Sequence, residues 1–97
     1  MKNPEQPLPN TFTFEIITPD RIFYKGTVTS VVAPGMEGSF GILASHAPLL
    51  ARSNGGKLKI RGTSNEEHFF QVGSGLVEVI KNRVIFFTKQ AQSLGNS

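Results

Sequence analysis

The residues of this chain that could carry chemistry gather in one segment, where Glu37, Ser45 and His46 supply the residue types of a hydrolase. In such an enzyme a serine attacks, a histidine takes its proton and a carboxylate orients the histidine. Ser45 and His46 are adjacent, however, so their side chains would point apart on an extended segment. Ser39, the other possible nucleophile, is not presented by a G-x-S-x-G turn, and neither is Ser45. The sequence therefore predicts no catalytic residue.

Metal and cofactor sites are not predicted either. The chain has 2 histidines, His46 and His68, and 0 cysteines, whereas a zinc site needs several ligands at tight spacing. The glycine-rich string Gly73-Ser74-Gly75 is not followed by a helical pattern, as a nucleotide-binding loop would be. We therefore expect a protein that works through binding surfaces.

An unusual concentration of glycine and proline marks residues 33–50, APGMEGSFGILASHAPLL. Glycine and proline fix backbone geometry that other residues rarely adopt, so we predict a shaped, exposed loop on a rigid scaffold. Phe40, Ile42 and Leu43 form an apolar run that should return this loop to the core. Loops of this kind often carry function.

Two features of this loop have alternative interpretations. The His46 ring could hold the loop through a backbone hydrogen bond, or it could contact a partner. Glu37 could be a solvated turn residue or a contact residue at the tip, beside Met36, whose flexible apolar side chain suits a contact surface.

The rest of the chain predicts β-strands. Phe12–Thr18 alternates apolar and polar residues and ends at Pro19-Asp20. Gly26 separates two β-rich runs, where we expect a bulge or a bend. The remaining strands are predicted at Arg21–Lys25, Thr27–Val32, residues 57–61, Glu67–Val72, Leu76–Ile80 and Val84–Thr88.

Strands follow one another at intervals of about 8 to 12 residues, and no window has a helical period. We therefore predict an all-β fold, a single antiparallel β-sandwich or flattened barrel. Aromatic residues in the strand patterns should supply much of its core. They are Phe12, Phe14, Phe40, Phe69, Phe70 and Phe86.

Length and charge limit the possibilities further. With 97 residues the chain forms one domain, for which we expect an N-terminal arm at 1–11, the sandwich at 12–91 and a tail at 92–97. Its apolar runs are far shorter than the roughly 20 residues that span a bilayer. The net charge is +3, but Lys57, Lys59 and Arg61 alternate along one strand with Leu58 and Ile60 facing in, so a solvated face is expected and nucleic-acid binding is not.

Three stretches together carry a resemblance to a known family. They are ITPDRIFYKGTVTSVVAPGMEGSFGILASHAPLL, the basic strand after it, and FFQVGSGLVEVIKNRVIFFT. They resemble the N-terminal β-sandwich domain of the epsilon subunit of F-type ATP synthases. The resemblance implies a sandwich of about ten strands at the foot of the central stalk, between the gamma subunit and the c-subunit ring. It also implies a non-catalytic, cofactor-free subunit of a proton-translocating complex, peripheral to the cytoplasmic, stromal or matrix face of an energy-transducing membrane.

The resemblance also implies partner contacts. By position, the ring contacts are Met36, Glu37, Gly38, Ser39 and His46. Ser39 stands where many members carry an acid, so no salt bridge is expected there. The gamma contacts follow no motif and are a guess: Phe69, Gln71, Leu76 and Glu78.

Family members often continue into two C-terminal helices, and no helical pattern follows the sandwich here. We therefore expect neither inhibition by a helical hairpin nor a nucleotide site. The alternative function is a free-standing β-sandwich binding module with one ligand site.

Overall fold

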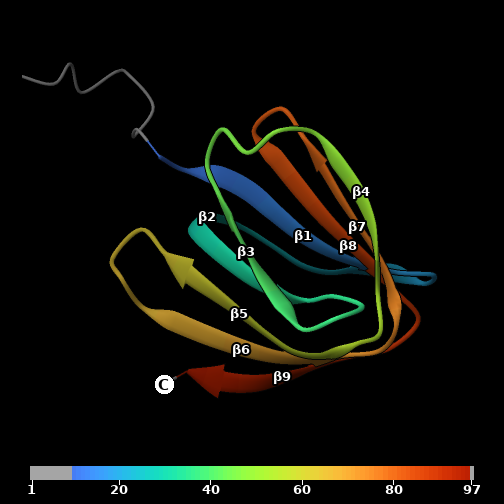
Figure 1. Cartoon of the computed structure of the whole chain (residues 1–97). Coiled ribbons are helices and arrows are strands. Elements are labelled where there is room, and N and C mark those ends of the chain that lie inside the picture. Colours follow the sequence, from blue (N-terminus) through green and yellow to red (C-terminus); the bar gives the residue numbers. More distant parts are fainter. Residues whose placement is uncertain (1–9, 97) are drawn as a thin grey trace, which may run out of the picture.

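The computed structural model describes residues 10–96, which form nine strands and no helix (Figure 1). The described residues accordingly contain no helix that is long and apolar enough to cross a membrane. The predicted arm at residues 1–11 lies almost wholly outside the described range. The strands are β1 (Phe12–Thr18), β2 (Arg21–Pro34), β3 (Ser39–Leu43), β4 (Leu49–Ser53), β5 (Gly56–Gly62), β6 (Glu67–Val72), β7 (Gly75–Ile80), β8 (Arg83–Thr88) and β9 (Ala91–Asn96).

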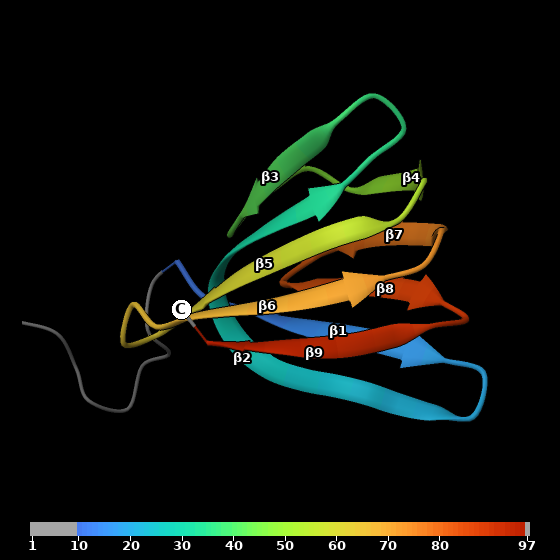
Figure 2. The same cartoon turned by 90° about the horizontal axis from the view of Figure 1, so that it is seen from below.

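One long strand, β2, joins two layers of a sandwich (Figure 2). Its first half pairs with β1, and its second half pairs with β3 and β5. The first layer is therefore β4-β7-β8-β1 with the start of β2, and the second layer is β3, the end of β2, β5, β6 and β9. This confirms the predicted all-β sandwich. All the pairings are antiparallel except β1 with β8, which is parallel.

The core lies between the layers and follows from period-two alternation. Phe14 and Ile16 of β1 and Phe86 of β8 are fully buried, and they face Leu58 and Phe70 of the second layer. Burying one such side chain contributes about 2 kcal/mol, so this cluster carries much of the stability. Of the predicted core aromatics, Phe40 and Phe69 are half-buried and the others are buried.

Gly26, where we expected a bulge or a bend, does not form a β-bulge. Strand β2 runs through Gly26, which pairs with Phe14 of β1. A Cβ at this position would lie 2.5 Å from the hydroxyl oxygen of Tyr24 and 3.0 Å from its Cζ. Glycine at this position therefore makes room for a packed ring.

The predicted end of the sandwich also differs from the structure. Residues assigned to a tail form β9, which pairs with β6 from Ala91 opposite Val72 to Asn96 opposite His68. The segment AQSLGN has no apolar alternation, because β9 is an exposed outer strand defined by its backbone pairing.

Candidate interaction surfaces

The turn between β2 and β3 forms a rigid tip. The backbone N–H of Gly35 donates to the carbonyl oxygen of Gly38 at 2.7 Å, and Gly38 has a φ of 120°, which favours glycine. The Asn54 side chain donates to the Met36 carbonyl at 3.2 Å. These bonds hold the backbone while the side chains of Met36 and Glu37 stay exposed.

Strand β3 presents its outward side chains to solvent. Phe40 and Ile42 point towards the core, whereas Ser39, Gly41 and Leu43 are exposed. Leu43 is 65% exposed, so the expectation that it returns the loop to the core is wrong. Period-two alternation from the buried Ile42 explains the difference.

His46 lies in the turn that follows β3. Its Nδ1 is 2.7 Å from the carbonyl oxygen of Ala47, and its backbone N–H donates to the Leu43 carbonyl at 3.2 Å. The preceding Ser45 has a φ of 67°. These contacts support a role in holding the loop, but the His46 side chain is exposed and free to meet a partner as well.

The five predicted ring-contact residues therefore lie along one edge of the sandwich. Met36, Glu37, Gly38 and Ser39 are at the tip, and His46 is beyond the other end of β3. Five strand residues at about 3.3 Å each separate the two ends by roughly 15 Å. We call this surface the β3 edge, defined as Met36–Ser39, Leu43 and His46. The same separation keeps Glu37 away from Ser45 and His46, so these three do not form a catalytic cluster.

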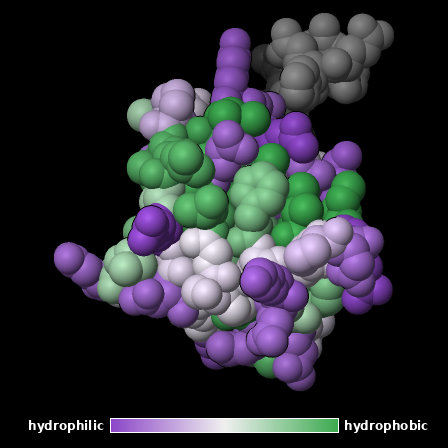
Figure 3. Space-filling model, turned by 90° about the vertical axis from the view of Figure 1, so that its right-hand side faces the viewer, coloured by the Kyte–Doolittle hydropathy of each residue, from purple (hydrophilic) through white to green (hydrophobic). Residues whose placement is uncertain are grey.

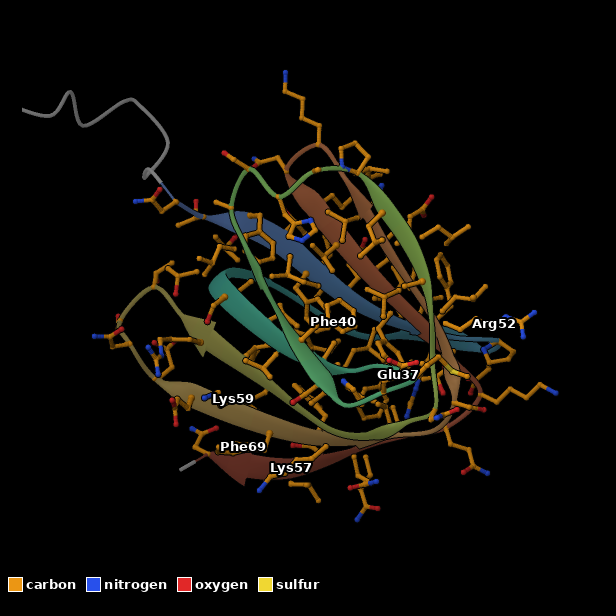
Figure 4. The ribbon with its side chains drawn as sticks, viewed as in Figure 1. Glu37, Phe40, Arg52, Lys57, Lys59 and Phe69 are labelled. Carbon is orange, nitrogen blue, oxygen red and sulfur yellow. The ribbon has the colours of Figure 1, made fainter. Side chains whose placement is uncertain are left out.

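A shallow groove of about 390 Å³ lies beside the tip. Its lining includes Met36 and Glu37 of the tip together with Leu49 and Arg52 of β4. Figure 4 shows Glu37 at the tip and Arg52 projecting from β4 away from the sandwich. The groove thus offers an apolar wall between one acidic and one basic side chain.

The outer face of the first layer carries an apolar row. Leu76 of β7 pairs with Phe87 of β8, Phe87 with Ile17 of β1, and Ile17 with Ile22 of β2. Leu50 of β4 adds a further side chain that is 67% exposed. Hydrophobic side chains gather on this side of the molecule in Figure 3. We call Ile17, Ile22, Leu50, Leu76 and Phe87 the apolar patch.

The four residues suggested for the gamma contact do not share one surface. Leu76 and Glu78 face outward from β7 in the first layer, whereas Phe69 and Gln71 face outward from β6 in the second. The connection from β6 to β7 crosses between the layers, which explains the separation.

Sequence reasoning missed most of the apolar patch, although a signal was present. The patch residues Ile17, Leu50 and Phe87 each directly follow another apolar residue in their strand, in the pairs Ile16-Ile17, Leu49-Leu50 and Phe86-Phe87. Because neighbouring strand residues point to opposite faces, one member of each pair has to face outward.

The second layer carries the basic residues on its outer face, as predicted. Arg61 Nη2 donates to Glu67 Oε2 at 2.6 Å, and Lys59 Nζ lies 3.6 Å from the same oxygen. The Arg61 hydrogen bond holds the pKa of the Glu67 carboxyl below its usual value. Lys57 Nζ lies 4.7 Å from the centre of the Phe69 ring (Figure 4). The basic side chains of this face therefore contact other side chains of the same face. Residues 10–96 contain no cluster of three or more side chains that could hold a metal ion.

Comparison with known proteins shows the family to which this chain belongs. The chain is 40% identical over 79 residues to the ATP synthase epsilon chain of Chlorobaculum tepidum, a match that covers 81% of this chain and 90% of the relative. It is 42% identical over 78 residues to that of Chlorobium limicola, covering 80% and 89%. A chain in the solved structure of the Euglena gracilis mitochondrial ATP synthase has the same fold, with a TM-score of 0.82 and 18% identity. That match covers 93% of this chain and 57% of the Euglena chain. Residues 11–93 match the beta-sandwich domain of the ATP synthase delta/epsilon chain, and the chain therefore belongs to this family.

Proposed function

We propose that this chain is a rotor subunit in the central stalk of a proton-translocating F-type ATP synthase. It links the gamma subunit to the membrane ring of c subunits, so that ion-driven rotation is coupled to ATP synthesis. Membership of the family supports the assignment of this chain to an ATP synthase. The Euglena structure that contains the chain with the same fold includes the F1 part and the c-ring. The observation that carries the proposal is that one sandwich bears two exposed surfaces, the β3 edge and the apolar patch.

The β3 edge is the proposed contact with the ring. Its tip offers exposed Met36 and Glu37 on a backbone that hydrogen bonds hold in place. A polar loop of another subunit can meet these groups without a large rearrangement, which keeps the ordering cost of binding low. If His46 contacts the ring as well, the ring surface has to run along the whole of β3.

The apolar patch is the proposed contact with gamma. Its row crosses four neighbouring strands, and Leu50 and Ile22 are 67% and 55% exposed. Contiguous apolar surface of this kind marks protein interfaces, whose centres are depleted in charge. Leu76 of the earlier gamma suggestion belongs to this patch and Glu78 flanks it, whereas Phe69 and Gln71 would need a second contact on the other layer.

Torque transmission requires stiffness and no catalytic group. The two layers share β2 and close over a core of fully buried side chains such as Phe14 and Phe86. Protein cores are packed as densely as organic crystals, so a load applied at one surface reaches the other with little deformation. We therefore propose a non-catalytic subunit without a cofactor, held at the membrane surface through the complex.

The test is to measure binding to the purified gamma subunit and to the detergent-solubilised c ring separately. Leu50→Glu should weaken binding to gamma and leave ring binding unchanged, and Glu37→Ala should do the reverse. Lys81→Glu, in the exposed turn before β8, is the matched charge control for both. His46→Ala then shows whether the ring reaches the far end of β3. Failure of the wild-type chain to bind either partner at micromolar concentration would contradict the proposal and favour a free-standing binding module.

A further inference from the structure

A hollow of about 660 Å³ opens at one end of the apolar patch. Its lining includes three patch residues, Ile17, Leu76 and Phe87. Its other walls come from the ends of β1 and β8 and from the connections that follow β6 and β8. These walls include Thr18, Gly73, Ser74, Thr88, Lys89 and Gln90.

The string Gly73-Ser74-Gly75 lines this hollow and packs closely against β8. A Cβ at Gly75 would overlap the carbonyl oxygen of Phe87, and a Cβ at Gly73 would lie 3.2 Å from Thr88 Oγ1. Glycine at both positions lets the β6–β7 connection lie directly against β8. The string Gly73-Ser74-Gly75, which lacks the helix of a nucleotide-binding loop, thus forms one wall of a surface hollow.

Hydrogen bonds fix the rim before any partner arrives. The Thr88 hydroxyl donates to the Ser74 carbonyl at 3.0 Å, and the Gly73 N–H donates to the Gln90 carbonyl at 2.9 Å. On the opposite side, the Thr18 hydroxyl donates to the Asp20 carboxylate at 2.8 Å. A pre-formed rim lowers the cost of ordering on binding, which is typical of sites that anchor a side chain.

The chemistry of the hollow favours a particular occupant. Covering its apolar patch residues with hydrocarbon instead of water is favourable in free energy. Its volume equals that of about 20 molecules of liquid water. Lys89 is exposed at the rim, and no carboxylate among residues 10–96 forms an ion pair with it. A side chain that fills the hollow would therefore be apolar, and a neighbouring acid could reach Lys89.

We infer that this hollow is the anchor site of the gamma contact and receives a protruding apolar side chain next to an acidic residue. The inference rests on the proposed function, because it names the chemistry that gamma has to present to the apolar patch. Buried anchors of this kind carry most of the affinity in many interfaces, and the flat surface around them excludes water.

Two substitutions test the inference by measured affinity for purified gamma. Ser74→Trp fills the hollow and should weaken binding about tenfold, whereas Ser64→Trp in the exposed turn after β5 should not. Lys89→Glu reverses the rim charge and should weaken binding about fivefold, with a smaller penalty at high salt. Lys81→Glu is its matched control at the other end of the sandwich. Thermal unfolding of each variant confirms that the fold is kept, and Lys89→Glu, at an exposed rim position, tests the site independently of Ser74→Trp.

The outcomes separate the two ideas. The anchor site would be overturned if Ser74→Trp and Lys89→Glu both bound gamma with an affinity within twofold of wild type while Leu50→Glu bound much more weakly. The proposal that the apolar patch binds gamma would then still hold. Wild-type affinity for Leu50→Glu and Ile22→Glu as well would overturn both.

Discussion

Arg83 on β8 forms an ion pair with the buried carboxylate of Glu15 on β1. Its Nε and Nη2 lie 2.8 and 2.7 Å from the same oxygen, and the Glu15 side chain is 3% exposed. The two residues join the strands of the parallel β1–β8 pair on the outer face that bears the apolar patch. This ion pair therefore reinforces the part of the first layer on which the proposed gamma contact depends.

Removing Arg83 should destabilise the fold through the charge that it leaves behind. We expect Arg83→Met to lower the free energy of unfolding by about 2 kcal/mol, because a buried carboxylate loses a charged hydrogen bond and its ion-pair partner. Replacing both residues, Glu15→Met with Arg83→Met, should recover much of this loss. Urea unfolding of both single variants and the double variant gives the coupling energy. Purely additive losses would show that the pair contributes nothing beyond its separate side chains.

Gly75 is expected to be far less tolerant of a methyl group than Gly41. The Cβ of Gly75→Ala would overlap the Phe87 carbonyl, and β7 cannot move away without breaking its pairing with β8. A loss of about 3 kcal/mol or failure to fold should result. At Gly41 no atom lies within 4 Å of an added Cβ, so Gly41→Ala should change stability by less than about 0.5 kcal/mol. Equal losses in thermal unfolding would refute this packing at β7.

The ion pair of Glu67 should make part of the stability depend on pH. The Arg61 hydrogen bond lowers the pKa of Glu67 from its usual value of 4.5 in the folded state. The stabilisation is therefore complete above the unfolded pKa and disappears as the pH falls through the lower folded pKa. Wild type should exceed Glu67→Gln in urea midpoint at pH 7, and the difference should vanish near the lower pKa. Glu37→Gln, at the exposed tip, is the control and should show no such convergence.

Strands with clean alternation could be predicted from the sequence to the residue. Phe12–Thr18 and Glu67–Val72 match β1 and β6, because every second side chain enters the core. Strand β9 could not be predicted in the same way, since AQSLGN is held by backbone pairing to β6 and buries little of its own. The absence of a bulge at Gly26 could not be predicted, because a glycine that makes room for a ring looks the same in sequence as a glycine that forms a bulge.

The candidate surfaces were predictable in part. The tip was found because Gly35 and Gly38 mark it locally. The apolar patch depends on which strands share a layer, and no local pattern shows that Phe87 lies beside Ile17, a residue 70 positions earlier (87 − 17). Likewise, Phe69 and Leu76 lie on different layers because the chain crosses from one layer to the other between β6 and β7, which no local pattern shows.

The most direct test of the rotor proposal is ATP synthesis in vesicles that contain the synthase depleted of this subunit. Adding back the wild-type chain should restore synthesis driven by an imposed proton gradient. Leu50→Glu and Glu37→Ala should each restore it several-fold less well, because each weakens one end of the link, and Lys81→Glu should match wild type. Full restoration by the combined Leu50→Glu, Glu37→Ala variant would contradict the claim that these two surfaces couple gamma to the ring.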